Sequence, residues 1–281
     1  MIVTADDFGL HEAVNQAVEQ AAREGILTAT SLMVGQPGSA DAVERARRLP
    51  GLAVGLHLAL TDATAMLSRD EIPDLVDATG RFRPRMAREG ARLFALPRVR
   101  RQLAAEVRAQ FRAFAETGLV LDHLDAHKHF HLHPTILGMV LSIGREFGLR
   151  AVRLPREPLL PALRMPGGGR MRRLAGSLFL LPWVRLMRAR LRAAGMRHND
   201  ALFGLGVTGR MDEAALLSIL RRLPAGVSEL YLHPATRERF SPAMPDYAHR
   251  AELAALTSPR VREYLERAGI VRMAYGQLVS G

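Results

Sequence analysis

Short apolar runs alternate along the chain with longer amphipathic stretches. The runs typical of buried strands are residues 2–5, 30–34, 52–58, 119–124, 151–154, 201–205, 229–232 and 271–274. Between them, apolar residues recur at helical spacing in residues 12–23, 40–49, 98–117, 134–147, 212–222 and 260–268. Strands that alternate with helices predict an α/β fold with a parallel sheet and crossover helices, such as a (β/α) barrel.

Two insertions interrupt this alternation, at about 61–96 and 160–199. The first is turn-rich and basic, which indicates a long loop. The second has no Asp or Glu and nine arginines around an apolar core at 178–184, which is too short to span a bilayer. An Arg-rich helix at 170–195 that carries Leu, Phe and Trp is able to lie in a membrane interface. The alternative is an excursion that packs over the barrel mouth.

Length and composition narrow the classes of protein to which the chain can belong. A length of 281 residues suits one barrel, and the absence of cysteine requires any metal to be held by imidazole and carboxylate. No basic and apolar leader precedes the first strand, so we expect a cytoplasmic protein. The net charge of +11 suggests nucleic acid or anionic lipid as a partner, but a solvated basic surface is the simpler interpretation.

Polar residues gather where the predicted strands end. Asp6 and Asp7 end the first strand, His57 ends the third, a histidine cluster at 125–133 ends the fourth, and His233 ends the seventh. Arg153 and Glu157 follow the fifth strand in the same way. Because barrel enzymes work from the loops after the carboxyl ends of their strands, these residues predict one active site.

The histidine cluster is the strongest local signal. His127, His129 and His131 alternate, so in an extended segment they would face one way, toward one ion or one pocket. Asp125 or Asp122 is placed to accept the second N–H of a ligating imidazole. The alternative is a solvated, histidine-rich loop.

The other candidates are weaker in isolation. One of Asp6 and Asp7 suits a metal ligand and the other a base, but the pair also suits an N-cap for the next helix. A lone His57 is more often a core histidine, and His233 either donates a proton or caps backbone carbonyls. Arg153 either holds a catalytic carboxylate in its charged form or belongs to the basic surface.

Taken together, these segments resemble the YdjC/ChbG-type carbohydrate deacetylases. The similarity lies in Thr4-Ala5-Asp6-Asp7-Phe8-Gly9, Gly55-Leu56-His57-Leu58, Leu124-Asp125-Ala126-His127-Lys128-His129-Phe130-His131, Arg153-Leu154-Pro155-Arg156-Glu157 and Glu229-Leu230-Tyr231-Leu232-His233-Pro234. The motifs come in the family's order and span nearly the whole chain. The resemblance implies a distorted (β/α) barrel related to polysaccharide deacetylases.

The resemblance also implies roles for the site residues. Asp7, His57 and His127 would hold one divalent metal ion, zinc or magnesium. Asp6 would be the base, His233 the acid and Arg153 the partner that keeps Asp6 charged. We expect His129, His131 and Glu157 to contact the substrate. Where the family often has a further histidine, this chain has Lys128, which changes the charge of the pocket.

The basic insertion and the run from His198 to Gly204 look like the hopanoid-biosynthesis-associated branch of the family. The implied reaction removes the N-acetyl group from an N-acetylglucosamine unit of a glycosylated hopanoid, with peripheral contact at the inner face of the membrane and no nucleic acid bound. Alternatives are a deacetylase of soluble chito-oligosaccharides, another metal hydrolase on the same barrel, and a membrane- or nucleic-acid-binding protein without enzymatic activity.

Overall fold

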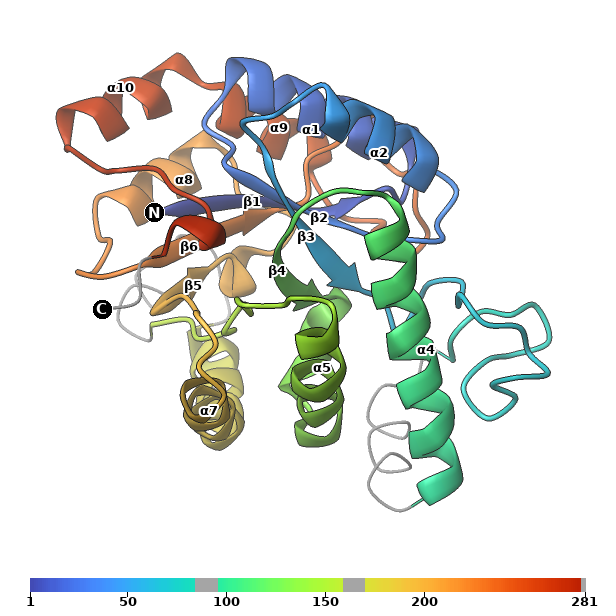
Figure 1. The fold of residues 1–281 in the computed structure, drawn as a ribbon. Coiled ribbons are helices and arrows are strands. Elements are labelled where there is room, and N and C mark those ends of the chain that lie inside the picture. Colours follow the sequence, from blue (N-terminus) through green and yellow to red (C-terminus); the bar gives the residue numbers. More distant parts are fainter. Residues whose placement is uncertain (84–95, 159–169, 279–281) are drawn as a thin grey trace.

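The computed structural model describes residues 1–83, 96–158 and 170–278, with the side chains of 170–177 left out. Its sheet consists of β1 (Ile2–Phe8), β2 (Ala29–Leu32), β3 (Ala53–Leu58), β4 (Leu121–Ala126), β5 (Ala201–Phe203) and β6 (Ser228–Leu232). All neighbouring strands are parallel, in the order β4-β3-β2-β1-β6-β5. The sheet curls into a half-barrel, which confirms the predicted fold class (Figure 1).

Helices surround the outside of this sheet. They are α1 (Glu12–Glu24), α2 (Ser39–Arg47), α4 (Pro97–Glu116), α5 (Pro134–Glu146), α7 (Arg170–Ala193), α8 (Glu213–Leu220), α9 (His249–Thr257) and α10 (Pro259–Arg267). Short 3₁₀ turns follow at η1 (His127–Leu132), η2 (Leu205–Val207) and η3 (Tyr275–Gln277). The six predicted helices are confirmed, whereas α9 was not predicted.

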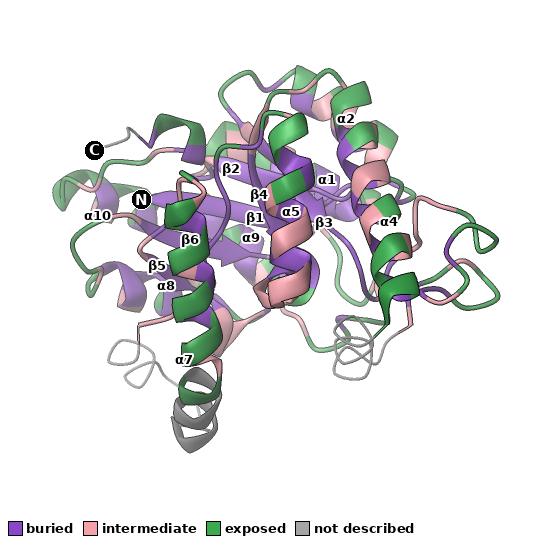
Figure 2. Cartoon of the chain, turned by 60° about the horizontal axis from the view of Figure 1, so that its bottom comes forward, coloured by how far each residue is buried: buried purple, intermediate pink, exposed green. Residues whose placement is uncertain are grey.

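The strands are buried on both faces, as expected where helices cover a parallel sheet. In Figure 2 the strands are buried and the outward sides of α2, α4 and α7 are exposed. Every residue of β1, β2, β5 and β6 is buried. Polar side chains in these strands therefore need partners inside the protein.

The extended segment 151–156 lies between the two edge strands. Leu124 of β4 donates its N–H to the carbonyl of Ala151, and Leu202 of β5 donates its N–H to the carbonyl of Arg156. The predicted strand at 151–154 forms only isolated bridges, to β4 and to Arg197. The segment carries Arg153 into the interior of the curled sheet.

The predicted strand at 271–274 is wrong. This segment has no strand assignment and makes two hydrogen bonds to the start of the chain, between Met273 N–H and the Met1 carbonyl and between the Met1 amine and the Val271 carbonyl. Val271 is 74% exposed, while Met273 packs against a small buried cluster that includes Ile2 and Tyr275, so the run is partly buried without pairing as a strand.

The two insertions are described in part. Residues 61–83 form bends with isolated antiparallel bridges between Thr64 and Arg81 and between Val76 and Phe82. In the second insertion α7 packs against α5 and η1. The remainder of the predicted insertions, 84–95 and 160–169, lies outside the described residues.

Asn199 links segment 151–156 to β5 where strand pairing is incomplete. Its side chain accepts a hydrogen bond from Leu154 N–H at 2.7 Å and donates to the carbonyls of Leu154 and Ala201 at 2.9 and 3.0 Å. We expect Asn199→Ala to lower the free energy of unfolding by about 2 to 4 kcal/mol, because buried backbone groups lose their partners. Denaturant unfolding measures this change.

The matched control is Ser228→Ala in β6. The Ser228 hydroxyl is buried and has no hydrogen-bond partner among the described residues, so its removal should cost little. Equal stability of the Asn199 variant and the wild type would show that Asn199 does not hold the segment.

Candidate active site

An irregularity at the end of β1 brings two adjacent carboxylates to one site. The pairing of β1 with β2 shifts register between Ala5 and Phe8, and Asp7 has a φ of 64°. In a regular strand adjacent side chains point to opposite faces, and a bulge changes that direction. Asp6 thus contacts Arg153 while Asp7 contacts two histidines.

The N-cap alternative for this pair is wrong. The N-cap of α1 is His11, whose ring accepts the N–H of Ala13. The two carboxylates are both buried, at 2% and 1% exposure, and make their contacts within the interior.

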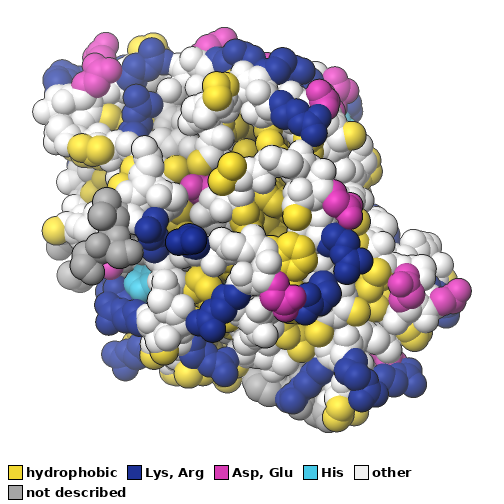
Figure 3. Space-filling model, in the orientation of Figure 1, with side chains coloured by type: hydrophobic (Ala, Val, Ile, Leu, Met, Phe, Trp, Pro, Cys, Tyr) yellow, Lys and Arg dark blue, Asp and Glu magenta, His cyan; other side chains and the backbone are white. Residues whose placement is uncertain are grey.

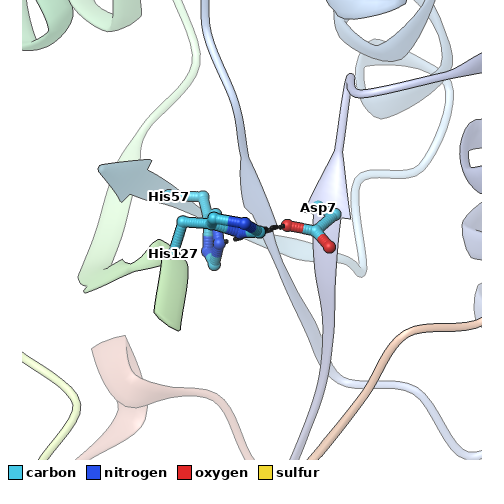
Figure 4. A group of neighbouring side chains, drawn as sticks. All are labelled: Asp7, His57 and His127. Atoms are coloured by element: carbon cyan, nitrogen blue, oxygen red, sulfur yellow. Dashed lines mark hydrogen bonds and ion pairs between the residues drawn. The ribbon is translucent and has the colours of Figure 1, made fainter. Parts of the chain in front are cut away.

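Asp7, His57 and His127 converge from three strand ends (Figure 4). The His57 Nε2 atom lies 3.2 Å and the His127 Nδ1 atom 3.1 Å from Asp7 Oδ1. One ligand-type atom from each residue lies within 4.8 Å of the others, and all three side chains are buried. The three residues that the family resemblance assigns to the metal are therefore neighbours in space.

The orientation of His57 is set by groups behind it. Its Nδ1 atom lies 2.7 Å from Asp125 Oδ1 and 3.0 Å from the Ser31 hydroxyl. These contacts leave Nε2 directed at Asp7. A carboxylate behind a ligating histidine fixes the tautomer that binds a metal, so Asp125 has the position that the sequence suggested. Asp122 instead pairs with His123, at 2.9 Å.

The site fits a divalent cation. Among the described residues, Asp7 Oδ2 and His57 Nε2 are buried and make no hydrogen bond. Burial opposes the charged form of Asp7, but His127 and His57 outweigh it and hold the pKa of Asp7 well below its usual value. A charged carboxylate with an unsatisfied oxygen beside an unsatisfied imidazole nitrogen is a suitable ligand set for such an ion.

Arg153 lies at the centre of a buried group of three carboxylates. It makes a two-pronged contact with Asp6, with both N···O distances 2.7 Å. It also lies 2.7 Å from Asp125 Oδ2 and 2.8 Å from Glu229 Oε1. Burial disfavours the charged guanidinium, but Asp125, Asp6 and Glu229 raise the pKa of Arg153 well above its usual value. Arg153 is thus part of the interior and not of the basic surface.

A second group of potential ligands, Asp6, His57 and Asp125, also lies close together. Both oxygens of Asp6 are held by Arg153, and Asp125 is shared between Arg153 and His57. The group around Asp7 is the better candidate because its ligand atoms are less engaged.

A cavity of about 220 Å³ opens beside this group. Its lining includes Asp6, His57, His127 and His233, with Lys128, His129, Leu205, Thr208, Tyr231, Met244 and Tyr247 around them. A larger hollow of about 930 Å³ lies at the opposite ends of β2, β3 and β4, and its lining includes Asp122 but none of the other predicted site residues. The smaller cavity is the candidate site because the ionisable groups converge on it.

His233 follows β6 and faces this cavity between two tyrosines. Its ring lies edge-on to Tyr231, at 5.6 Å between centroids, and to Tyr247, at 5.1 Å. Burial lowers the pKa of His233 against the opposing effect of Asp7 and Asp6. A lowered pKa makes a protonated imidazole a stronger proton donor.

The histidine cluster is not extended, and the predicted common direction of its side chains is wrong. Residues 127–132 form η1, in which Lys128 and His129 have φ values of 52° and 54°. This sharp turn separates the three rings. His127 joins Asp7, His129 packs edge-on against Tyr231 at 5.1 Å, and His131 bonds to the Arg153 carbonyl at 2.8 Å.

The three residues expected to contact substrate have different surroundings. His129 lines the cavity. His131 is fully buried and holds the backbone of Arg153. Glu157 accepts hydrogen bonds from Gly204 and Gly206 N–H, at 3.2 and 3.3 Å, and so supports the loop that contains the cavity residue Leu205.

Lys128 lies at the rim of the cavity and forms an ion pair with Asp62, at 2.5 Å. Lys128 and Asp6 thus line the same cavity, but the charge of the lysine has an acidic partner from the first insertion. The change in pocket charge expected from Lys128 is therefore partly offset.

Two site features were missed in the sequence. Glu229 was named only as part of a motif. A single acidic residue in an apolar strand indicates a buried partner of opposite charge. That partner is Arg153, which lies in an apolar run of its own. Tyr247 comes from the loop before α9, and its spacing carries no signal for a site residue.

The chain is similar in sequence to known carbohydrate deacetylases. Carbohydrate deacetylases of Brevibacillus brevis and Vibrio parahaemolyticus are 39% and 28% identical to the chain, over 55% and 100% of its length. A chitooligosaccharide deacetylase of Escherichia fergusonii is 34% identical over 59% of the chain. These matches cover 59%, 96% and 64% of the three relatives' own lengths, respectively.

A solved structure has the same fold. It is a protein of Enterococcus faecalis V583 whose description concerns cellobiose-phosphate cleavage. Its TM-score against this chain is 0.74 and its sequence identity is 26%, and the match covers 99% of this chain and 98% of that one. The YdjC-like protein family model matches residues 1–267. The chain therefore belongs to the YdjC-like protein family.

Proposed function

We propose that the chain is a metal-dependent hydrolase that removes the acetyl group from an N-acetylglucosamine unit. The observation that carries this proposal is the convergence of Asp7, His57 and His127 beside a second carboxylate, Asp6, and a separate imidazole, His233. The names of the relatives, carbohydrate and chitooligosaccharide deacetylases, support the same class of substrate.

The donor set suits a transition-metal ion. Asp7, His57 and His127 would hold it with two imidazoles and one carboxylate, which favours zinc over magnesium because magnesium prefers oxygen ligands. When bound there, a divalent ion supplies a Lewis acid that polarises a carbonyl and lowers the pKa of water.

Asp6 and His233 divide the proton transfers between them. Asp6 accepts the proton of the attacking water, and Arg153 fixes the direction of its carboxylate through two hydrogen bonds. His233 donates a proton to the amine as the C–N bond breaks, and acetate and the free amino sugar result. Both residues line the cavity, on which the metal-binding group also converges.

The cavity is suited to one sugar unit. Its volume of about 220 Å³ is below the range of roughly 300–1,000 Å³ typical of sites for drug-sized ligands. Tyr231 and Tyr247 offer ring surfaces for a sugar, and Leu205, Ala243 and Met244 provide an apolar wall for the acetyl methyl group.

We further propose that the sugar is carried on a lipid such as a hopanoid. Support comes from α7, which has apolar residues on two sides. Val184, Met187 and Leu191 are buried, while Phe179, Trp183 and Leu186 are 74%, 38% and 42% exposed. The exposed residues, with Leu178 and the exposed Arg185 and Arg192, form what we name the outer face of α7.

The position of the outer face near the site supports the proposal of a membrane contact. Helices of such a barrel run back against the strands, so the first half of α7, which contributes Leu178 and Phe179 to the outer face, lies at the end where the strands terminate. The helix also packs against η1, which carries His127. None of the helices in the described part of the chain is long and apolar enough to cross a bilayer, so contact at the surface is the form proposed.

Basic side chains do not form one stripe on the face drawn in Figure 3, where Lys and Arg are dispersed among other residues. A groove for nucleic acid has concentrated positive charge. On this face the dispersed charge favours an enzyme with a solvated basic surface over a nucleic-acid-binding protein.

The first test concerns the metal. Asp7→Ala should lose the bound divalent ion and acetate release from N-acetylglucosamine oligomers, because a carboxylate ligand is removed. Elemental analysis and an acetate assay measure the two effects. His198→Ala, a histidine whose ring bonds to the Asn199 carbonyl, is the control and should retain both. Retention of metal and activity in Asp7→Ala would refute the ligand assignment.

The second test concerns the acid. His233→Ala should retain the metal while the rate of acetate release falls about 10²- to 10⁴-fold, the usual contribution of a general acid. Paired measurements of kcat and metal content check this. An unchanged kcat would remove His233 from the mechanism.

The third test concerns the lipid. The double variant Phe179→Ser/Trp183→Ser should bind anionic vesicles less well and deacetylate a lipid-linked N-acetylglucosamine more slowly, with soluble chito-oligosaccharides unaffected. Val120→Ser is the control, because Val120 is 85% exposed but precedes β4 at the opposite end of the sheet. Equal loss on soluble and lipid-linked substrates would contradict the role of the outer face.

A further inference from the structure

The backbone on both sides of His233 is held by two side chains of one helical turn. Glu252 Oε2 accepts the His233 N–H at 2.5 Å, and His249 Nδ1 donates to the His233 carbonyl at 2.6 Å. His249 and Glu252 are three residues apart at the start of α9, so they lie on the same side of the helix. Both are buried, at 1% exposure.

The His233 ring itself lacks such support. Its Nδ1 atom is buried and has no hydrogen-bond partner among the described residues. Catalytic histidines are usually oriented by a carboxylate bonded to the ring. Here the ring has edge-on contacts with Tyr231 and Tyr247, which limit its tilt but do not fix the position of its α-carbon.

We infer that Glu252 and His249 are positioning residues for His233, which they hold over the cavity through its backbone. The inference rests on the proposed role of His233 as the acid. A proton donor must stand within hydrogen-bond reach of the departing nitrogen, and a displacement of about 1 Å can cost about a hundredfold in rate.

The same two residues connect His233 to other parts of the chain. Glu252 Oε1 also accepts the N–H of Met211, at 3.0 Å. Glu238 holds the start of α9 by accepting the N–H groups of His249 and Arg250, at 3.1 and 3.0 Å. Glu238 therefore supports the positioning residues and is no control. The matched control is Glu106, which is also buried and whose two carboxylate oxygens accept the N–H groups of Met66 and Leu67, at 2.9 and 3.0 Å, in bonds that do not involve α9.

The decisive variant is Glu252→Gln. Its amide keeps one acceptor oxygen but presents an NH₂ group to one of the two backbone N–H groups, so a bond is lost. We expect kcat for an N-acetylglucosamine oligomer to fall about ten- to a hundredfold with little change in KM or metal content. Hydrolysis of 4-nitrophenyl acetate should change little, because its leaving group needs no proton. Glu106→Gln disturbs a pair of bonds of the same kind and should leave both rates unchanged.

Two further comparisons separate positioning from a general structural role. In a His233→Ala background, Glu252→Gln should have no additional effect on kcat, because the residue it positions is absent. His249→Leu should lower kcat, whereas His249→Asn should restore most of it, since the asparagine N–H occupies about the place of Nδ1. If Glu252→Gln does not fold, the comparison of His249→Leu with His249→Asn tests the inference in its place.

Equal losses on both substrates, or an additional loss in the His233→Ala background, would overturn the inference. Wild-type protein that releases no acetate from any N-acetylated sugar would instead refute the proposed function. Independently of activity, a crystal structure of Glu252→Gln should show the His233 ring displaced, and an unmoved ring would overturn the positioning role.

Discussion

One buried guanidinium determines how the strands and the site fit together. Arg153 has no exposed surface and joins Asp6 of β1, Asp125 of β4 and Glu229 of β6 from the segment between β4 and β5. Removing one partner from such a cluster costs about 3 to 5 kcal/mol because the remaining charges stay buried and uncompensated. The curled sheet and the carboxylates at its end therefore depend on the same contacts.

The balance of charge around Arg153 also bears on the metal. Asp6, Asp125 and Glu229 are buried carboxylates that contact the permanent cation Arg153. The buried carboxylate of Asp7 contacts two histidines instead. An excess of negative charge in the interior is costly unless it is offset by protonated histidine or by a bound cation. The buried carboxylates that hold the sheet together through Arg153 thus favour a positive charge, from a cation or a protonated histidine, at Asp7.

Much of this arrangement could be predicted from the sequence. The alternation of apolar runs and amphipathic stretches predicted the parallel sheet, because both periodicities are local properties. Asp7, His57 and His127 were expected together since each follows a strand, and parallel strands end at one edge. Local patterns do not predict backbone turns or long-range pairs. The left-handed conformations of Lys128 and His129 break the expected alternation of the histidine side chains. The contact between Glu252 and His233 forms only in the folded chain.

The central claim is that Asp7, His57 and His127 together bind one divalent ion. Anomalous diffraction from crystals of zinc-loaded protein tests it most directly. The expected result is a single anomalous peak among these three side chains, within bonding distance of each. A peak bound by other residues, or none at this position in zinc-loaded crystals, would contradict the claim.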